Sequence, residues 1–197
     1  MQVTRILGCA ALAIASTRRA ADAFMPAAVA ARGAFRTPGS TQGVSSTSLR
    51  MVSVGQAPPD FKLMDQNSKT VSLSSFKKKK KVVVFFYPKD STPGCTKEAQ
   101  TFQADLAQFK KLGAEVIGIS SDADHSKFVQ ENGLSMTLLS DIGGKVRKEW
   151  KVKGAVFGTI DGRVTYVLDK NGVVTSMYDN LLDGAAHSKE ALKALQG

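Results

Sequence analysis

The chain has 197 residues, which is enough for one ordinary domain with an extension but scarcely for two full domains. Its apolar fraction of 43% allows a sizeable core, and its formal net charge is +10. Residues 1–51 contain six arginines, no lysine and one acid, so they account for +5 of this charge. The excess positive charge is therefore not a property of one broad surface. Two cysteines and two histidines are too few for a disulfide framework or a structural zinc site.

The first 51 residues have the composition of a targeting leader. An apolar run at 6–16 is too short to span a bilayer and is followed by a small-residue pattern that ends at Ala23, which predicts a signal peptide over residues 1–23. Residues 24–51 lack acids and lysines and are rich in Ala, Arg, Ser and Thr, which predicts a disordered transit peptide. Residues 52–197 then form the folded domain. A buried helix of that domain is the alternative for the apolar run.

The junction after the predicted signal peptide, Ala23-Phe24-Met25-Pro26, resembles the Ala-Phe-x-Pro cleavage signature of algae with secondary plastids. In those cells a protein crosses the endoplasmic reticulum before it enters the plastid, so the resemblance implies a bipartite signal plus transit peptide. No second hydrophobic run follows before Asp60. We therefore expect the plastid stroma rather than the thylakoid lumen.

The remaining sequence alternates between strand and helix patterns. A turn-rich stretch at 65–69 between two short apolar segments predicts a β-hairpin over 61–73. The run VVVFFY at 82–87 is apolar throughout and predicts a strand buried on both faces. Over 93–112, apolar residues recur at three- and four-residue steps and predict a helix that Gly113 ends.

Shorter elements continue this alternation. Further strands are predicted at 115–120 and 137–140, short helices at 124–132 and 145–151, two paired strands at 164–169 and 173–178, and a last helix at 188–195. Asn171-Gly172 between the paired strands is a strong hairpin signal. The pattern predicts the α/β class with a mixed central sheet flanked by helices. Its order suits a thioredoxin-like fold with an N-terminal β-hairpin extension.

The segment between the first buried strand and the long helix carries the chemistry. Thr92 suits the N-cap position and Pro93 the first helical position, so Cys95 falls in the first turn. Unpaired backbone N–H groups and the helix dipole favour an anion there, and the nucleophilic form of cysteine is the thiolate. A single cysteine without such a context is more often a small buried apolar residue. Here the helix start and Pro88 favour a nucleophile.

The same segment carries a family resemblance. Pro88-x-x-x-Thr92-x-x-Cys95 matches the active-site motif of the peroxiredoxins. The longer string FFYPKDSTPGCTKEA, with VIGIS, LLSD, KVRKEW and GRVTYVLDKNGVV further on, resembles the bacterioferritin-comigratory-protein, or peroxiredoxin Q, branch. The resemblance extends from Pro58 to near the C-terminus. It implies a thioredoxin-like fold and a thiol-dependent peroxidase that reduces hydrogen peroxide or organic hydroperoxides without metal, haem or other cofactor.

The resemblance also implies roles for four residues. Cys95 is the peroxidatic nucleophile, which becomes a sulfenic acid. Thr92 would offer its hydroxyl to the thiolate or the peroxide, and Pro88 would shield the thiolate from water, although N-cap and strand-terminator roles also fit these two residues. Arg163 matches the family's arginine near the thiolate, where a fixed cation would hold the sulfur charged. Arg147, in KVRKEW, is expected on a surface helix.

One position departs from the family pattern. Many members of this branch have a second cysteine five positions after the first, and Gln100 occupies that position here. Because Cys9 lies in the predicted leader, Cys95 is the only thiol of the predicted domain, and no internal disulfide can form. The cycle is therefore expected to close with an external thiol from thioredoxin, glutaredoxin or glutathione, in a monomer or weak dimer. A disulfide between two Cys95 residues is the less favoured alternative.

Three other functions compete with this one. A thioredoxin-type disulfide oxidoreductase needs a Cys-x-x-Cys pair, which Thr92-Pro-Gly-Cys95 does not provide. A peroxide-sensing redox switch with little turnover stays open, although Pro88, Thr92 and Arg163 favour turnover. The five lysines at 77–81 could contact nucleic acid or an anionic membrane. Because no aromatic residues are interleaved, we expect instead a solvated loop, no nucleic-acid partner and no stable membrane insertion.

Overall fold

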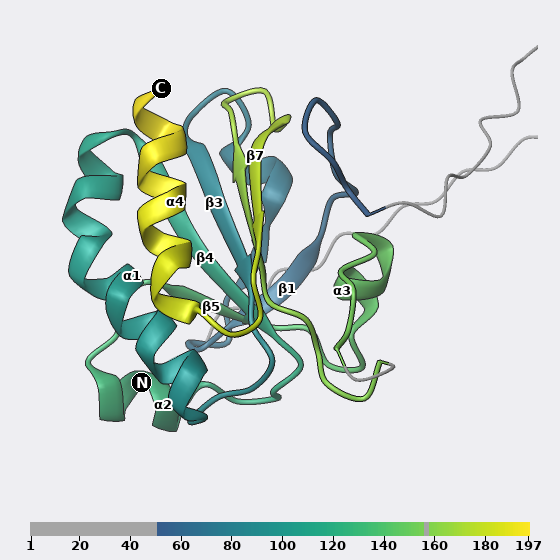
Figure 1. The fold of residues 1–197 in the computed structure, drawn as a ribbon, viewed down its shortest axis with the longest axis vertical. Coiled ribbons are helices and arrows are strands. Elements are labelled where there is room, and N and C mark those ends of the chain that lie inside the picture. The colour runs from purple at the N-terminus through teal and green to yellow at the C-terminus, as the bar shows by residue number, and fades with distance from the viewer. Residues whose placement is uncertain (1–50, 156–157) are drawn as a thin grey trace, which may run out of the picture. The chain divides into compact units, whose positions relative to one another are not determined.

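The computed structural model describes residues 51–155 and 158–197. Within these residues a seven-stranded sheet has the order β2-β1-β5-β4-β3-β6-β7 (Figure 1). β4 pairs in parallel with both β3 and β5, and all other neighbours pair antiparallel. The strands are β1 (Lys62–Asp65), β2 (Thr70–Ser72), β3 (Lys81–Phe86), β4 (Ala114–Ser120), β5 (Thr137–Ser140), β6 (Val164–Leu168) and β7 (Val174–Asp179).

Helices cover both faces of the sheet. α1 (Pro93–Lys111) and α4 (Gly184–Gln196) lie side by side on one face, and α3 (Lys145–Glu149) lies on the other (Figure 1). α2 (Ser126–Asn132) packs on the same side as α1, and a 3-10 helix, η1 (Leu73–Phe76), connects β2 to β3. Two apolar cores result, one beneath α1, α2 and α4 and the other beneath α3.

β3 lies inside the sheet and is buried on both faces, as its continuous apolar run predicts. Because successive side chains of a strand point to opposite faces, Val83 and Phe85 join the core beneath α1, whereas Val84 and Phe86 join the core that contains Trp150. Because β3 lies between β4 and β6, the residues that follow it emerge among the strand ends near the middle of the sheet. α/β proteins commonly place their functional sites beyond the carboxyl ends of such strands.

The observed elements confirm the predicted α/β class, the mixed sheet with flanking helices and the N-terminal hairpin. The hairpin is an integral part of the sheet, because β1 also pairs antiparallel with β5. α4 begins at Gly184, earlier than the predicted start at 188. Its start is fixed by Asp183, whose carboxylate accepts a hydrogen bond from the Ala186 N–H and so caps the helix. α2 and α3 are both shorter than predicted.

Several predictions concern residues outside the described ranges. The predicted signal peptide (1–23), nearly all of the predicted transit peptide (24–51) and Cys9 lie there. In the part of the chain that the structure describes, no helix is both long and apolar enough to cross a membrane.

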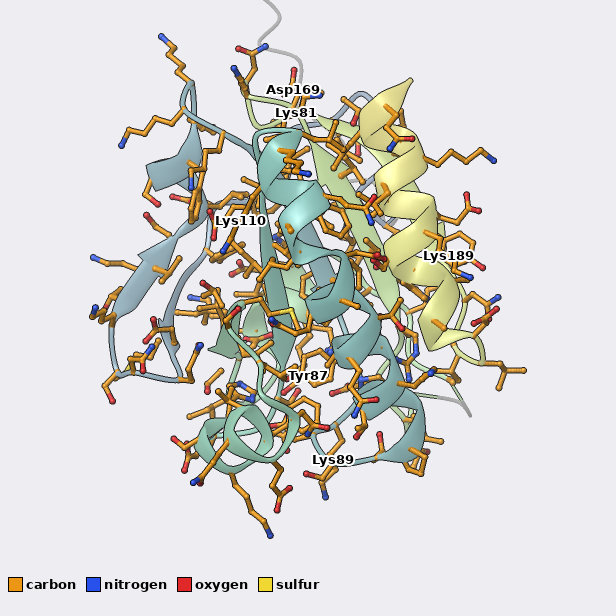
Figure 2. All side chains as sticks on the ribbon, turned by 90° about the vertical axis from the view of Figure 1, so that its left-hand side faces the viewer. Lys81, Tyr87, Lys89, Lys110, Asp169 and Lys189 are labelled. Atoms are coloured by element: carbon orange, nitrogen blue, oxygen red, sulfur yellow. The ribbon has the colours of Figure 1, made fainter. Side chains whose placement is uncertain are left out.

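The five lysines at 77–81 lead from η1 into β3. Those at 77–80 are exposed, as expected for a solvated loop, and Lys80 forms an ion pair with Glu115 at 2.7 Å. Figure 2 shows Lys81, at the start of β3, toward one end of the molecule and Tyr87, just after the end of β3, toward the other. The lysine run is therefore remote from the segment that leads into α1.

Candidate active site

Cys95 lies in the first turn of α1, behind the carboxyl end of β3. The active-site loop (residues 87–92) leaves β3 and enters the helix, with Thr92 at the N-cap position and Pro93 in the first turn, as predicted. The Thr92 hydroxyl donates to the Lys89 carbonyl oxygen at 3.1 Å and does not cap the helix, so Thr92 is an N-cap by position only. Cys95 is a free cysteine, 2% exposed, and packs in the core beneath α1.

Arg163 supplies a polar contact to the sulfur. It directly precedes β6, whose first residue, Val164, pairs with Phe86 at the end of β3, so the sheet register brings it beside the active-site loop. Its Nη2 donates to the Cys95 sulfur over 3.3 Å, and its Nε donates to the Leu181 carbonyl oxygen over 3.0 Å. Arg163 is 4% exposed, so water screens its charge little. A cation in this position favours the thiolate over the thiol.

A buried carboxyl group shares this guanidinium. Glu98, one helical turn after Cys95, is fully buried, and its Oε2 accepts a hydrogen bond from Arg163 Nη1. Burial raises the pKa of Glu98 from 4.5 to about 8, although the charge of Arg163 acts in the opposite direction. Oε1 accepts no hydrogen bond from the described residues and lies 3.7 Å from His187 Nδ1. Because Glu98 holds a proton for much of the time near neutral pH, more of the guanidinium charge remains available to the sulfur.

His187 fills the space behind Glu98 without adding a charge. Its Nε2 lies 2.8 Å from the Asn180 carbonyl oxygen, which can only accept, so Nε2 carries the proton. Nδ1 then accepts a hydrogen bond from the Thr165 hydroxyl at 2.8 Å. Burial, together with the charge of Arg163, lowers the pKa of His187 to about 4. The neutral ring therefore does not compete with Arg163 for the Glu98 carboxylate.

Arg147 lies inside the molecule, and the expectation that it sits on the outside of a surface helix is wrong. Arg147 is 5% exposed. Its Nη1 donates to the Gly162 carbonyl oxygen at 2.7 Å, and its Nη2 donates to the Tyr87 carbonyl oxygen at 2.8 Å. The guanidinium also lies over the Phe86 ring, 5.4 Å from its centroid. These carbonyls lie just outside β6 and β3, and a forked donor can satisfy both. Arg147 thus holds the first residue of the active-site loop.

Of the four predicted site residues, the structure brings Cys95 and Arg163 into contact. Pro88 and Thr92 are both partly buried and flank the active-site loop, whose backbone receives the Thr92 hydrogen bond. Sequence reasoning missed Glu98, although a signal was present. The buried positions along α1 are 95, 98, 99, 102, 106 and 109, so an acid occupies a core position of the helical repeat.

The described residues contain no group of three or more His, Cys, Asp or Glu side chains arranged to hold a metal ion. What they present is a buried thiol at a helix start, hydrogen-bonded by a fixed arginine.

Solved structures show which class of protein has this architecture. Peroxidoxin BcpB from Mycobacterium tuberculosis matches with a TM-score of 0.67 and 34% identity, over 73% of this chain and 96% of that chain. Xanthomonas campestris peroxiredoxin Q matches with a TM-score of 0.63 and 30% identity, over 69% of this chain and 89% of that chain.

These matches confirm the predicted thioredoxin-like fold and define the class as a cysteine-dependent peroxidase. Residues 54–177 match the AhpC/TSA family. The chain is 53% identical over 159 residues to the chloroplastic peroxiredoxin Q of Populus jackii, a match that covers 80% of this chain and 74% of that protein. The chain belongs to the peroxiredoxin Q family, and it is a thiol-dependent oxidoreductase.

Proposed function

We propose that this protein reduces hydrogen peroxide and organic hydroperoxides with Cys95 as the nucleophile. The thiolate attacks one peroxide oxygen, an S–O bond forms as the O–O bond breaks, and the leaving oxygen takes up a proton to become water or an alcohol. The sulfur is oxidised to a sulfenic acid as the peroxide is reduced. The observation that carries the proposal is the 3.3 Å hydrogen bond from Arg163 Nη2 to the sulfur at the buried start of α1.

The other site residues support this step in different ways. Arg163 keeps the sulfur charged and offers a cation to the polar O–O group of the substrate. Pro88, at the start of the active-site loop, shields the thiolate from water. The Thr92 hydroxyl donates to the Lys89 carbonyl in the resting structure, but a hydroxyl also has lone pairs that accept and a proton that can rotate toward a bound peroxide.

The cycle proposed here uses one cysteine. Cys95 is the free cysteine of the described residues, and position 100, where a resolving thiol would be expected, holds a glutamine. A sulfenic acid condenses with a thiol to form a disulfide, so the thiol must come from outside. Thioredoxin, glutaredoxin or glutathione would attack the oxidised sulfur, form a mixed disulfide and release water. A second donor thiol would then restore Cys95 in a protein that is a monomer or weak dimer.

The plastid stroma is the proposed location. Relatives such as those from Populus jackii and Arabidopsis thaliana are named chloroplastic, which supports a plastid for this chain. The acid-free leader and the Ala23-Phe24-Met25-Pro26 junction support import into the secondary plastid of an alga. In this proposal residues 1–23 are a signal peptide, 24–51 a transit peptide and 52–197 the mature peroxidase.

A peroxide-sensing redox switch is the second candidate, because the same thiolate could be oxidised once and then signal. Steady turnover separates the two. With thioredoxin, glutaredoxin or glutathione as reductant, we expect continuous peroxide consumption by the wild type. We expect none from Cys95→Ser, whose oxygen is a far poorer nucleophile at neutral pH. A single stoichiometric burst with every donor would favour the switch, and substantial turnover by the serine variant would overturn the assignment of Cys95.

A further inference from the structure

The active-site loop is anchored near its midpoint by a buried polar cluster, which consists of Tyr87, Asp90, Ser120, Asp122 and His125. Asp90 Oδ1 accepts from the Tyr87 hydroxyl at 2.6 Å, and Asp90 Oδ2 lies 2.7 Å from His125 Nδ1. The Asp90 backbone N–H donates to Asp122 Oδ2 at 2.9 Å, and this oxygen also accepts from the Ser120 hydroxyl at 2.9 Å. One residue of the loop is thus held through both its backbone and its side chain.

The cluster joins two chain segments that the sheet brings together. Tyr87 and Asp90 follow β3, and the other three members lie at or after the end of its parallel neighbour, β4. Asp90 stands midway between Pro88 and Thr92, so holding it holds the whole loop. Reacting groups keep a productive geometry only when the residues behind them are themselves locked by packing and hydrogen bonds. The cluster therefore fixes where Pro88 and Thr92 lie with respect to the sulfur.

His125 supplies the positive charge of this cluster. Its ring is fully buried, and burial alone would lower its pKa. The hydrogen bond and charge of Asp90 oppose this effect, together with the Leu139 backbone and the Asp122 charge, and the net result raises the pKa of His125 above 6.5. Tyr87 remains a neutral donor, because burial and the charge of Asp90 raise its pKa well above 10.0. The imidazolium is thus the partner that two neighbouring carboxylates share.

Two further acids, Asp65 and Asp124, line a cavity of about 420 Å³ together with His125. Because the folded state raises the pKa of His125, the charged pair with Asp90 is complete at pH values below that pKa and is lost as the pH rises through it. Once the ring is neutral, Asp90 and Asp122 stand close together with no cation between them.

We propose that Asp90 and His125 are positioning residues for the peroxide step, which hold the active-site loop so that Pro88 and Thr92 keep their places beside Cys95. This role rests on the proposed peroxidase function, and neither residue contacts the reacting atoms. While His125 is charged, the loop is fixed and the reaction is fast. When the ring loses a proton, Nδ1–H can still donate to Asp90, but the bond is no longer charge-assisted, so the anchor weakens and the reaction slows.

The rate constant of the reduced protein with hydrogen peroxide, measured by stopped flow across a pH series, tests this role. His125→Gln is the informative variant, because its amide N–H can still donate to Asp90 but does not titrate. The ratio of the wild-type rate to the variant rate should fall as the pH rises above 6.5, since only the wild type loses a charge-assisted bond to Asp90. Glu98 titrates in both proteins and cancels in the ratio. His125→Ala leaves Asp90 Oδ2 without its ring partner and should be slower by roughly 10- to 100-fold at neutral pH.

Val129→Ala is the matched control, because it removes side-chain packing between α2 and the core and keeps the backbone hydrogen bond from Val129 to the His125 carbonyl oxygen. It should lower stability and keep the wild-type pH profile. A constant ratio between the wild type and His125→Gln across the series would overturn the positioning role alone. So would a loss of rate in His125→Ala that Val129→Ala reproduces at equal loss of stability. A wild-type protein that does not react with peroxide would overturn the proposed function, and this role with it.

Discussion

Arg163 donates a hydrogen bond from Nη2 to the sulfur of Cys95 over 3.3 Å, and both side chains are almost fully buried. A cation fixed there in a poorly solvated site stabilises the thiolate over the thiol. For Arg163→Met we expect the reaction of the reduced protein with hydrogen peroxide at neutral pH, measured by stopped flow, to slow by roughly 10-fold or more.

Lys148→Met is the matched control for this charge change. Lys148 is an exposed cation of α3, and its ammonium donates to the Gly143 carbonyl oxygen at 3.0 Å. Its loss should leave the rate of the reaction with hydrogen peroxide at the wild-type value. A wild-type rate in Arg163→Met would mean that the observed hydrogen bond does not control the reactivity of Cys95.

Glu98 leads to a predicted pH dependence of stability. Burial raises its folded-state pKa from 4.5 to about 8. The contribution of Glu98 to stability is therefore complete below pH 4.5 and is lost as the pH rises through about 8. We expect the free energy of unfolding, measured by denaturant titration, to fall over this interval through the release of up to about one proton. Glu98→Gln should remove that part of the pH dependence, because an amide does not titrate.

Glu115→Gln provides the comparison for Glu98. The Glu115 carboxylate lies on β4, is partly exposed and pairs with Lys80 at 2.7 Å. Its replacement should preserve the wild-type slope of stability against pH. If Glu98→Gln also preserved the full slope, Glu98 would have to be ionised throughout, and the ion pair with Arg163 would then outweigh the cost of burial.

The start of α4 rests directly on the start of α1. A Cβ atom at Gly184 would lie 2.7 Å from the Gly94 carbonyl oxygen, closer than real Cβ atoms approach, and 3.0 Å from Glu98 Cβ. Gly184→Ala must therefore displace α4 from Gly94, the residue that precedes Cys95. We expect a loss of roughly 1–3 kcal/mol in unfolding free energy and a slower peroxide step. Gly197→Ala, whose nearest neighbour would be 3.9 Å away, should change neither, and equal behaviour of the two variants would contradict close packing here.

Local sequence signals specify the parts of the site that lie on consecutive residues. The apolar run of β3 predicts a buried strand, and Thr92 followed by Pro93 predicts a helix start, so the position of Cys95 in the first turn of α1 follows from a stretch of fewer than about fifteen residues. Neither signal depends on the rest of the fold. The same holds for Asn171-Gly172, which sets the hairpin between β6 and β7.

The sequence does not predict residues whose partners are far away in the chain. The local sequence around Arg147 indicates a solvated charge, yet Arg147 donates to the Tyr87 carbonyl oxygen, 60 residues away in the chain. His125 pairs with Asp90 across 35 residues, and no periodicity in either segment indicates the other. A charged group is buried where the tertiary structure supplies acceptors, and those acceptors are fixed only once the strands have paired. Arg163 was predicted only because the family motif contains it.

The one-cysteine cycle proposed above depends on Gln100. It lies on the exposed side of α1 and donates to the Asn132 side chain at 3.0 Å, whereas Cys95 is buried and is the free cysteine of the described residues. With one equivalent of peroxide we expect a monomer that is heavier by one oxygen and whose sulfenic acid reacts with dimedone. Excess peroxide without a donor should carry the sulfur on to sulfinic acid. Mass spectrometry under non-reducing conditions measures both products.

Gln100→Cys tests whether α1 can bring the two positions together. Five helical residues separate them by about 7.5 Å along the axis, whereas the Cα atoms of a disulfide lie within about 7 Å. An internal disulfide therefore requires the first turns of α1 to open, so we expect it to form slowly and to protect Cys95 from sulfinic acid. Gln108→Cys, near the far end of α1, should give no such protection. A wild-type protein that runs mainly as a disulfide-linked dimer after stoichiometric oxidation would contradict the one-cysteine cycle, because the second thiol would then come from another subunit.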